Sequence, residues 1–220
     1  MLAKKNTHKL FLFFSAALIM YGVALGLTGS GQIHLLPSIA GGGQIHFRAL
    51  KTFTYQSNLF LVIGFVVMLL MKADNKLRHY FSVSVMLATA VTGLVYNFLL
   101  VPIAQAPMFF TNYVNFSTHV LVMVLPLVNY FAFEGKGFLN RRHILAGMIF
   151  PGLYWVVFVA IGERINFFPY FFMNPNSVGW VMVFLWFGVL LSVFAGLGFL
   201  LMLYDGAMGR RATPSTPSSW

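Results

Sequence analysis

Six long stretches of the chain are almost entirely apolar, and short polar segments separate them. A helix needs about 20 such residues to cross a bilayer, and none of the six stretches contains Asp, Glu, Lys or Arg. We therefore predict an all-α integral membrane bundle of six transmembrane helices. The predicted spans are Leu10–Thr28, Phe53–Met71, Phe81–Ile103, Phe116–Phe133, Ile144–Ile161 and Val178–Tyr204.

The composition supports this assignment to the membrane class. Hydrophobic residues make up 59% of the 220 positions and charged residues only 8%, whereas a soluble domain carries about a quarter charged residues. Residues 1–211 are predicted to form a single six-helix transmembrane domain. Residues 212–220 are rich in Pro, Ser and Thr, and a tail of this composition is expected to be disordered.

The distribution of Lys and Arg predicts the orientation in the membrane. Eleven of the 14 cationic residues fall in segments that share a side with the N-terminus, and only Arg48, Lys51 and Arg164 fall on the other side. Because Lys and Arg accumulate in cytoplasmic segments, both termini are predicted to be cytoplasmic in a multi-pass protein of the cytoplasmic membrane. The net charge of +10 is then a consequence of topology, and it predicts no nucleic-acid partner.

Polar side chains open the second and fourth predicted spans at helical spacing. Thr54, Ser57 and Asn58 stand at i, i+3 and i+4, so they share one helix face. Asn115 and His119 repeat the i, i+4 spacing, and no other histidine falls within a predicted span. An ionisable residue within a membrane is a candidate for function. The alternative is that these Ser, Thr and Asn side chains join helices as structural hydrogen bonds.

The predicted topology brings further polar residues to the same outer depth. Asn97 lies late in the third span, and the loop after the fifth span contains Glu163, Arg164, Tyr170 and Asn174. Glu163 and Arg164 are adjacent and can equally be a pair that anchors the chain at the membrane interface. Together with the openings of the second and fourth spans, these residues predict one site at the outer end of the bundle.

The same segments carry a resemblance to a known family. The sequence Phe47-Arg48 followed by Phe53–Leu59 (FTYQSNL) resembles the opening of the second span in a bacterial family of predicted six-span proteins, Pr6Pr. The segment Phe168–Asn174 (FPYFFMN) resembles the YPYPFLD signature of that family, and Arg164 before it also has a counterpart there. The chain departs from the signature at Phe168, Phe171 and Asn174.

That family is similar to the androgen-induced and androgen-dependent membrane hydrolases, which cleave fatty acid esters of hydroxy fatty acids with a threonine nucleophile and a histidine. The resemblance implies that Thr54 is the nucleophile and His119 the base of a lipid esterase without a metal or cofactor. A lipid from the outer leaflet would be the substrate. The residues expected to bind it, or to stabilise the oxyanion, are Ser57, Asn58, Asn97, Asn115, Arg164, Tyr170 and Asn174.

The chemistry is consistent with this interpretation, because a threonine hydroxyl needs a base within hydrogen-bond reach and a neutral imidazole can be that base. Three other classes remain open. A transporter or lipid-binding protein would show a broken-helix site or an internal repeat, and the chain shows no repeat. A haem protein would need paired intramembrane histidines. A metal-dependent hydrolase would need several ligands, and His34, His46, His119 and Glu163 are the outer candidates.

Overall fold

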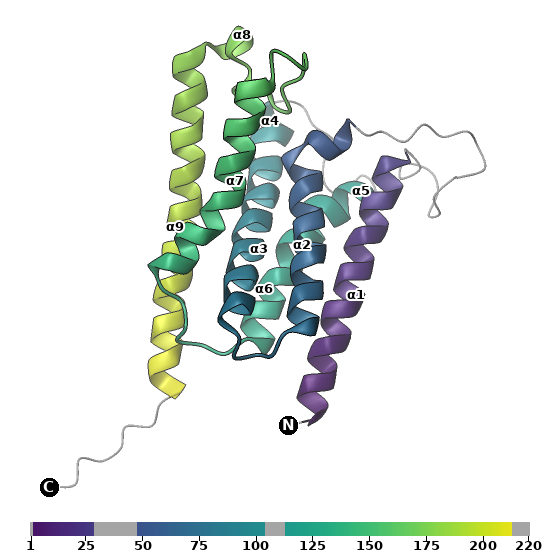
Figure 1. Ribbon diagram of the computed structural model, residues 1–220, viewed down its shortest axis with the longest axis vertical. Helices are drawn as coiled ribbons and strands as arrows, with labels where there is room; N and C mark the ends of the chain where they lie inside the picture. The colour runs from purple at the N-terminus through teal and green to yellow at the C-terminus, as the bar shows by residue number, and fades with distance from the viewer. Residues whose placement is uncertain (1, 29–47, 104–112, 213–220) are drawn as a thin grey trace, which may run out of the picture.

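Six long apolar helices form the bundle in a computed structural model that describes residues 2–28, 48–103 and 113–212 (Figure 1). The predicted all-α membrane fold with six spans is therefore confirmed. Two parts of the chain named above lie outside the described residues: the tail beyond Ala212, and the first loop with His34 and His46.

The spans are built from the following elements. The first, second and fifth are single helices, α1 (Leu2–Leu27), α2 (Phe53–Leu70) and α7 (Arg141–Ile161), and the sixth is α9 (Trp180–Ala212). The third is α3 (Lys76–Val95), a π-helical turn η3 (Tyr96–Leu100) and α4 (Val101–Ile103). The fourth is α5 (Tyr113–Phe116), a second π-helical turn η4 (Ser117–Leu121) and α6 (Val122–Phe133). Three short helices lie between spans: η2 (Ala49–Lys51), η5 (Phe171–Met173) and α8 (Pro175–Val178).

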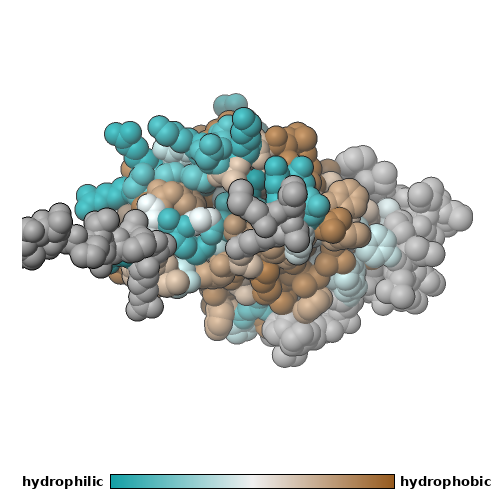
Figure 2. All heavy atoms as spheres, turned by 90° about the horizontal axis from the view of Figure 1, so that it is seen from below, coloured by the Kyte–Doolittle hydropathy of each residue, from teal (hydrophilic) through white to brown (hydrophobic). Residues whose placement is uncertain are grey.

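The bundle has two distinct ends. At the lower end in Figure 1 lie the start of α1, the end of α9 and the segments 71–75 and 134–140. At the upper end lie the start of α2, the end of α3 and the segment 162–179. Viewed from below, hydrophilic side chains gather on the lower end beside hydrophobic flanks (Figure 2). The predicted orientation would make the lower end cytoplasmic and the upper end the outside.

Helix α3 is the centre of the bundle. It contacts α2, α6, α7 and α9, and it is the most buried of the six spans. Helix α1 packs mainly on α2, and α9 packs mainly on α7. The outer faces of α7 and α9 expose large apolar side chains such as Leu153, Phe184 and Leu200. These faces suit contact with lipid.

The two π-helical turns meet where α3 approaches the fourth span. A methyl group added to Gly93 would lie only 2.8 Å from the backbone oxygen of His119. A small residue lets two membrane helices approach each other closely. Gly93 therefore allows the backbone of η4 to lie directly against α3, one turn below η3.

Candidate functional site

Thr54 lies in the first turn of α2, buried at the upper end of the bundle. Thr52 caps the helix, because its side chain accepts a hydrogen bond from the backbone of Tyr55, and this fixes where α2 begins. The backbone N–H of Thr54 donates to the hydroxyl of Tyr170 over 3.3 Å. The predicted nucleophile is therefore joined to the predicted signature segment.

Tyr170 is held in place by stacked aromatic rings. Its ring stacks on Phe172 with 5.2 Å between centroids, and Phe172 stacks on Trp155 at 5.7 Å. Burial raises the pKa of the Tyr170 hydroxyl above its ordinary value. The hydroxyl therefore stays protonated at neutral pH and can donate a hydrogen bond beside Thr54.

Ser57 and Asn58 join helices through backbone atoms. The side-chain amide of Asn58 donates to the carbonyl oxygens of Thr54 at 2.7 Å and Thr118 at 3.1 Å. The hydroxyl of Ser57 donates to the same Thr54 oxygen and lies 2.7 Å from the hydroxyl of Thr92. Both N–H groups of Asn58 are thus engaged, so in this geometry Tyr170 and not Asn58 is the donor available to an oxyanion at Thr54.

His119 lies in the π-helical turn η4, buried against Tyr96 with 3.4 Å between ring centroids. Its Nδ1 lies 3.1 Å from the carbonyl oxygen of Asn115 and 3.1 Å from the hydroxyl of Thr118. A carbonyl oxygen only accepts, so the proton of the neutral ring is on Nδ1. The other nitrogen, Nε2, is then the one that can accept a proton.

No hydrogen bond joins Thr54 to His119 among the described residues. They are connected indirectly, because Asn58 bridges the backbones of Thr54 and Thr118. Tyr96 provides a second connection, since it stacks on His119 and lines a cavity beside Thr54. The structure therefore brings the two predicted reactive residues to adjoining helices, with the Tyr96 ring against the histidine.

That cavity lies between α2, α3, α7 and α9 and has a volume of about 50 Å³. Its polar lining groups are the side chains of Thr54, Thr92, Tyr96, Tyr154 and Tyr170, with Trp155 among the otherwise apolar remainder. About 10–15 Å³ is enough to hold one water molecule. The cavity has room for water or for a short part of an acyl chain, and a whole chain would require the helices to part.

The remaining predicted site residues have separate roles. Asn97 donates from its amide to the carbonyl of Gly93 at 2.8 Å, and its buried side-chain oxygen has no partner among the described residues. Asn115 holds the His119 ring through its backbone oxygen. Asn174 caps α8 by accepting from the backbone of Asn176. Arg164 is exposed at the upper end.

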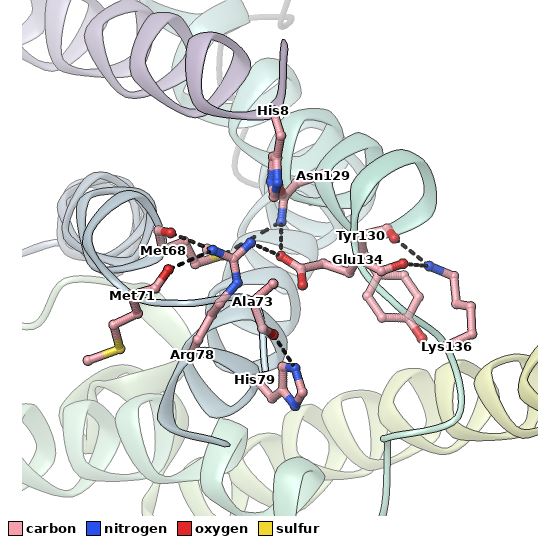
Figure 3. A network of polar contacts seen from close by, with 10 residues as sticks. All are labelled: His8, Met68, Met71, Ala73, Arg78, His79, Asn129, Tyr130, Glu134 and Lys136. Atoms are coloured by element: carbon pink, nitrogen blue, oxygen red, sulfur yellow. Dashed lines mark hydrogen bonds and ion pairs between the residues drawn. The ribbon is translucent and has the colours of Figure 1, made fainter. Parts of the chain in front are cut away.

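The lower end contains a second polar cluster that the sequence analysis did not predict (Figure 3). Arg78 and Glu134 form a buried ion pair at 2.8 Å, with side-chain exposures of 5% and 3%. Asn129 donates to the same Glu134 oxygen at 3.4 Å, and its own oxygen lies 2.8 Å from Nε2 of His8. Arg78 also donates to the backbone oxygen of Met68. The cluster thereby joins α1, α2, α3 and α6.

Asp205 extends the buried charges of the lower end to α9. It is fully buried, accepts from the hydroxyl of Tyr130 at 2.6 Å and accepts from the backbone of Leu139 at 2.8 Å. Lys136 donates to the backbone oxygen of Tyr130 at 2.6 Å and lies over its ring. These contacts fasten the 134–140 segment to the end of α9.

One sequence signal could have identified this second cluster. Glu134 and Asp205 each follow directly after a predicted span, in a chain with only four acidic residues. A carboxylate at the edge of the hydrocarbon is costly unless it is paired, so carboxylates at these positions call for a partner. The sequence analysis counted Arg78 only as an orientation charge and overlooked the pairing.

Among residues 2–28, 48–103 and 113–212, no three His, Asp or Glu side chains come together as a metal site. Comparison of the chain with protein-family models, with curated proteins and with solved structures finds no match in any of the three. The resemblance to the six-span family thus stays a prediction from its motifs. The site must be interpreted on its own geometry.

Proposed function

We propose that the protein is a membrane-embedded hydrolase of lipid esters, with Thr54 as the nucleophile. The observation that carries the proposal is the buried Thr54, whose backbone N–H donates to the Tyr170 hydroxyl at the wall of a mainly apolar cavity. A hydroxyl nucleophile beside a fixed donor in a water-poor site supplies two of the parts that ester cleavage requires, and a base is the third. The FTYQSNL and FPYFFMN resemblances support the same assignment.

The reaction would proceed in two steps. The Thr54 oxygen attacks the ester carbonyl and loses its proton, and the oxyanion that forms accepts a hydrogen bond from the Tyr170 hydroxyl. The bond to the alcohol oxygen breaks, and the alcohol leaves with the proton. Water then attacks the acyl-threonine, which releases the fatty acid and returns the proton to Thr54.

We assign the base to His119 because Nε2 is its unprotonated nitrogen. The ring does not line the cavity, so a proton from Thr54 must reach it through water or after a shift of the Tyr96 ring. The neighbouring π-helical turns provide a place for such a shift, because π-turns are common at functional sites and can relax towards α-helix.

The test is ester hydrolysis by the full chain in proteoliposomes, measured as release of free fatty acid. Thr54→Ala is expected to lose activity by a factor on the order of 10⁴ or more, and Thr54→Ser to retain part of it. Acid quenching of the native protein should trap an acyl group on Thr54 that mass spectrometry can locate. Full activity in Thr54→Ala would refute the proposal.

Two matched variants control for general damage to the fold. Thr89→Ala removes a buried threonine hydroxyl whose partners among the described residues are backbone oxygens of α3, and it should hydrolyse the ester normally. His79→Ala removes a histidine from the lower end and should also remain active. His119→Ala should lose most of its activity, and unchanged hydrolysis would remove His119 from the mechanism.

Transport is a second candidate, and the two π-helical turns favour it. They interrupt the third and fourth spans where those spans meet, and discontinuous helices form the binding sites of many transporters. Uptake of a small solute into proteoliposomes, unchanged by Thr54→Ala, would favour transport over hydrolysis.

A further inference from the structure

A second pocket lies on the solvent side of Tyr170, within the 162–179 segment at the upper end. Its volume is about 350 Å³, which is within the range of about 300–1,000 Å³ for small-molecule sites. Tyr170 lines both this pocket and the apolar cavity. The two spaces are therefore neighbours, with the Thr54-bonded tyrosine between them.

Local contacts fix the walls of this outer pocket. The backbone N–H of Phe167 donates to the carbonyl of Gly162 at 2.9 Å, and Asn166 between them has a positive φ of 46°. The ring of Phe167 is held from outside the pocket lining by Arg48 and Lys51, at 5.0 and 5.5 Å from its centroid. The 162–179 segment thus forms an ordered pocket wall, because main-chain hydrogen bonds and cation–π contacts both restrain it.

The lining chemistry of the outer pocket differs sharply from that of the inner cavity. Four polar side chains stand among aromatic rings: Glu163, Asn166, Asn174 and Asn176. Amides both donate and accept, a carboxylate accepts, and an aromatic face packs against C–H groups. This combination suits adjacent hydroxyl groups on a carbon skeleton.

The charge of the lining further restricts the chemical class of ligand that the pocket can bind. Glu163 is the one ionisable carboxylate that lines the pocket, and the Arg48 and Lys51 cations lie outside the lining. A ligand carboxylate would meet a like charge in Glu163, which is unfavourable. A quaternary ammonium would suit Glu163 and the rings but would make no hydrogen bond to the amides of Asn166 and Asn176. Neutral hydroxyl groups satisfy all of these groups.

We propose that the outer pocket binds the neutral, hydroxyl-bearing head group of a lipid, glycerol or a sugar, whose acyl chain begins in the cavity behind Tyr170 and continues between the parted helices. This places the ester between head group and chain beside Tyr170 and Thr54. The assignment of that ester as the scissile bond rests on the proposed function. It selects acylglycerols or acylated sugars over esters whose alcohol part carries a free carboxylate.

The experiment measures binding to the full chain carrying Thr54→Ala, in nanodiscs, by scintillation proximity. The probes are tritiated octylglycerol ether and octyl glucoside, which contain no ester, with octanoate and octylphosphocholine as competitors. Empty nanodiscs give the background from lipid partitioning. Both hydroxylated probes should bind, and neither competitor should displace them at equal concentration.

Variants of the lining should weaken this binding selectively. Glu163→Gln is expected to raise the dissociation constant of both probes about tenfold, and Asn176→Ala about fivefold, because each removes hydrogen bonds to hydroxyl groups. Both positions are exposed, so the fold should tolerate the changes. Asp74→Asn is the matched control, since it removes one exposed negative charge at the lower end and should leave binding unchanged.

Two results would overturn the assignment: tighter binding of octanoate or octylphosphocholine than of the hydroxylated probes, or unchanged affinity in both lining variants. Failure of the proposed function would be seen separately. Ester hydrolysis that survives Thr54→Ala would refute the nucleophile while leaving head-group binding intact. If the probes bind without head-group selectivity but hydrolysis still depends on Thr54, only the head-group assignment is overturned.

Discussion

The upper and lower ends of the bundle both bury polar side chains, but they use different chemistry. At the lower end the groups are charged and mutually paired, as in Arg78 with Glu134 and in Asp205 with Tyr130. At the upper end they are hydroxyls, amides and the imidazole of His119. Buried atoms without a partner among the described residues occur at both ends: the side-chain oxygens of Asn58 and Asn97 above, and Nε of Arg78 below. The paired charges of the lower end are thus expected to stabilise the bundle, and the upper end contains the candidate site.

The largest expected effect is on the lower end. Glu134→Ala leaves the Arg78 guanidinium buried without its carboxylate, which should lower the free energy of unfolding by about 3–5 kcal/mol. Unfolding in mixed micelles, followed by circular dichroism, measures the change. The double variant Arg78→Met with Glu134→Leu should recover much of the loss, because no unpaired charge remains. A loss below about 1 kcal/mol in Glu134→Ala would mean that the pair is solvated and the contrast between the ends is weaker.

The next effect separates activity from stability at the upper end. Tyr170→Phe keeps the ring stacked on Phe172 and removes only the hydroxyl beside Thr54. Hydrolysis should fall by about 10²–10³, while the free energy of unfolding changes by about 0.5–1.5 kcal/mol. Steady-state kinetics and unfolding of the same preparation test this. Equal retention of activity and stability would exclude Tyr170 as the oxyanion donor.

Tyr170 also predicts a pH profile. Burial raises the pKa of its hydroxyl, so the donating, protonated form persists from neutral pH upward until pH reaches the raised value. The rate should therefore not fall through the ordinary tyrosine range near pH 10. A decline centred near pH 10 in the native protein, absent in Tyr170→Phe, would show that the hydroxyl is solvated.

A smaller effect is expected where the two π-helical turns meet. Gly93→Ala places a methyl group 2.8 Å from the backbone oxygen of His119, and overpacking of this kind costs about 1–3 kcal/mol. Gly196→Ala is the control, because nothing lies within 4 Å of its added methyl group. If both variants unfold alike, α3 and η4 are farther apart than the structure shows.

The smallest expected effect is that of Ser57→Ala. Its hydroxyl donates to the Thr54 carbonyl and lies beside Thr92, so its loss should cost about 0.5–1.5 kcal/mol of stability. Hydrolysis should change little, because Ser57 joins helices and does not line the cavity. A rate loss as large as that of Tyr170→Phe would give Ser57 a direct part in the reaction.

Much of the architecture could be predicted from the sequence because a bilayer imposes simple rules. The span predicted as Phe53–Met71 matches the observed helix Phe53–Leu70 to within one residue, and the span predicted as Phe81–Ile103 lies within an observed span that begins earlier, at Lys76. The predicted spans excluded the cations at the helix ends. The observed helices nevertheless begin at Lys76 and Arg141, because Asn75 and Asn140 cap them. The pattern of apolar residues predicts where lipid is, and the capping residues decide where the helices begin.

The candidate site was predicted in part. The i, i+3, i+4 spacing correctly placed Thr54, Ser57 and Asn58 on one face, because that follows from helical geometry alone. The partners of these side chains depend on how helices cross, which no local pattern specifies. The π-helical conformation around His119 and the hydrogen bond from the backbone N–H of Thr54 to Tyr170 could not be predicted for this reason.

The sequence alone determined that this chain forms six membrane helices, because hydrocarbon excludes charge and demands satisfied backbone hydrogen bonds over a fixed thickness. It also determined which polar residues share the upper end, since the order of spans alternates their direction. Only the tertiary structure decided which of these residues meet. It paired Thr54 with Tyr170 and Arg78 with Glu134, because contacts between distant segments depend on the crossing and spacing of packed helices.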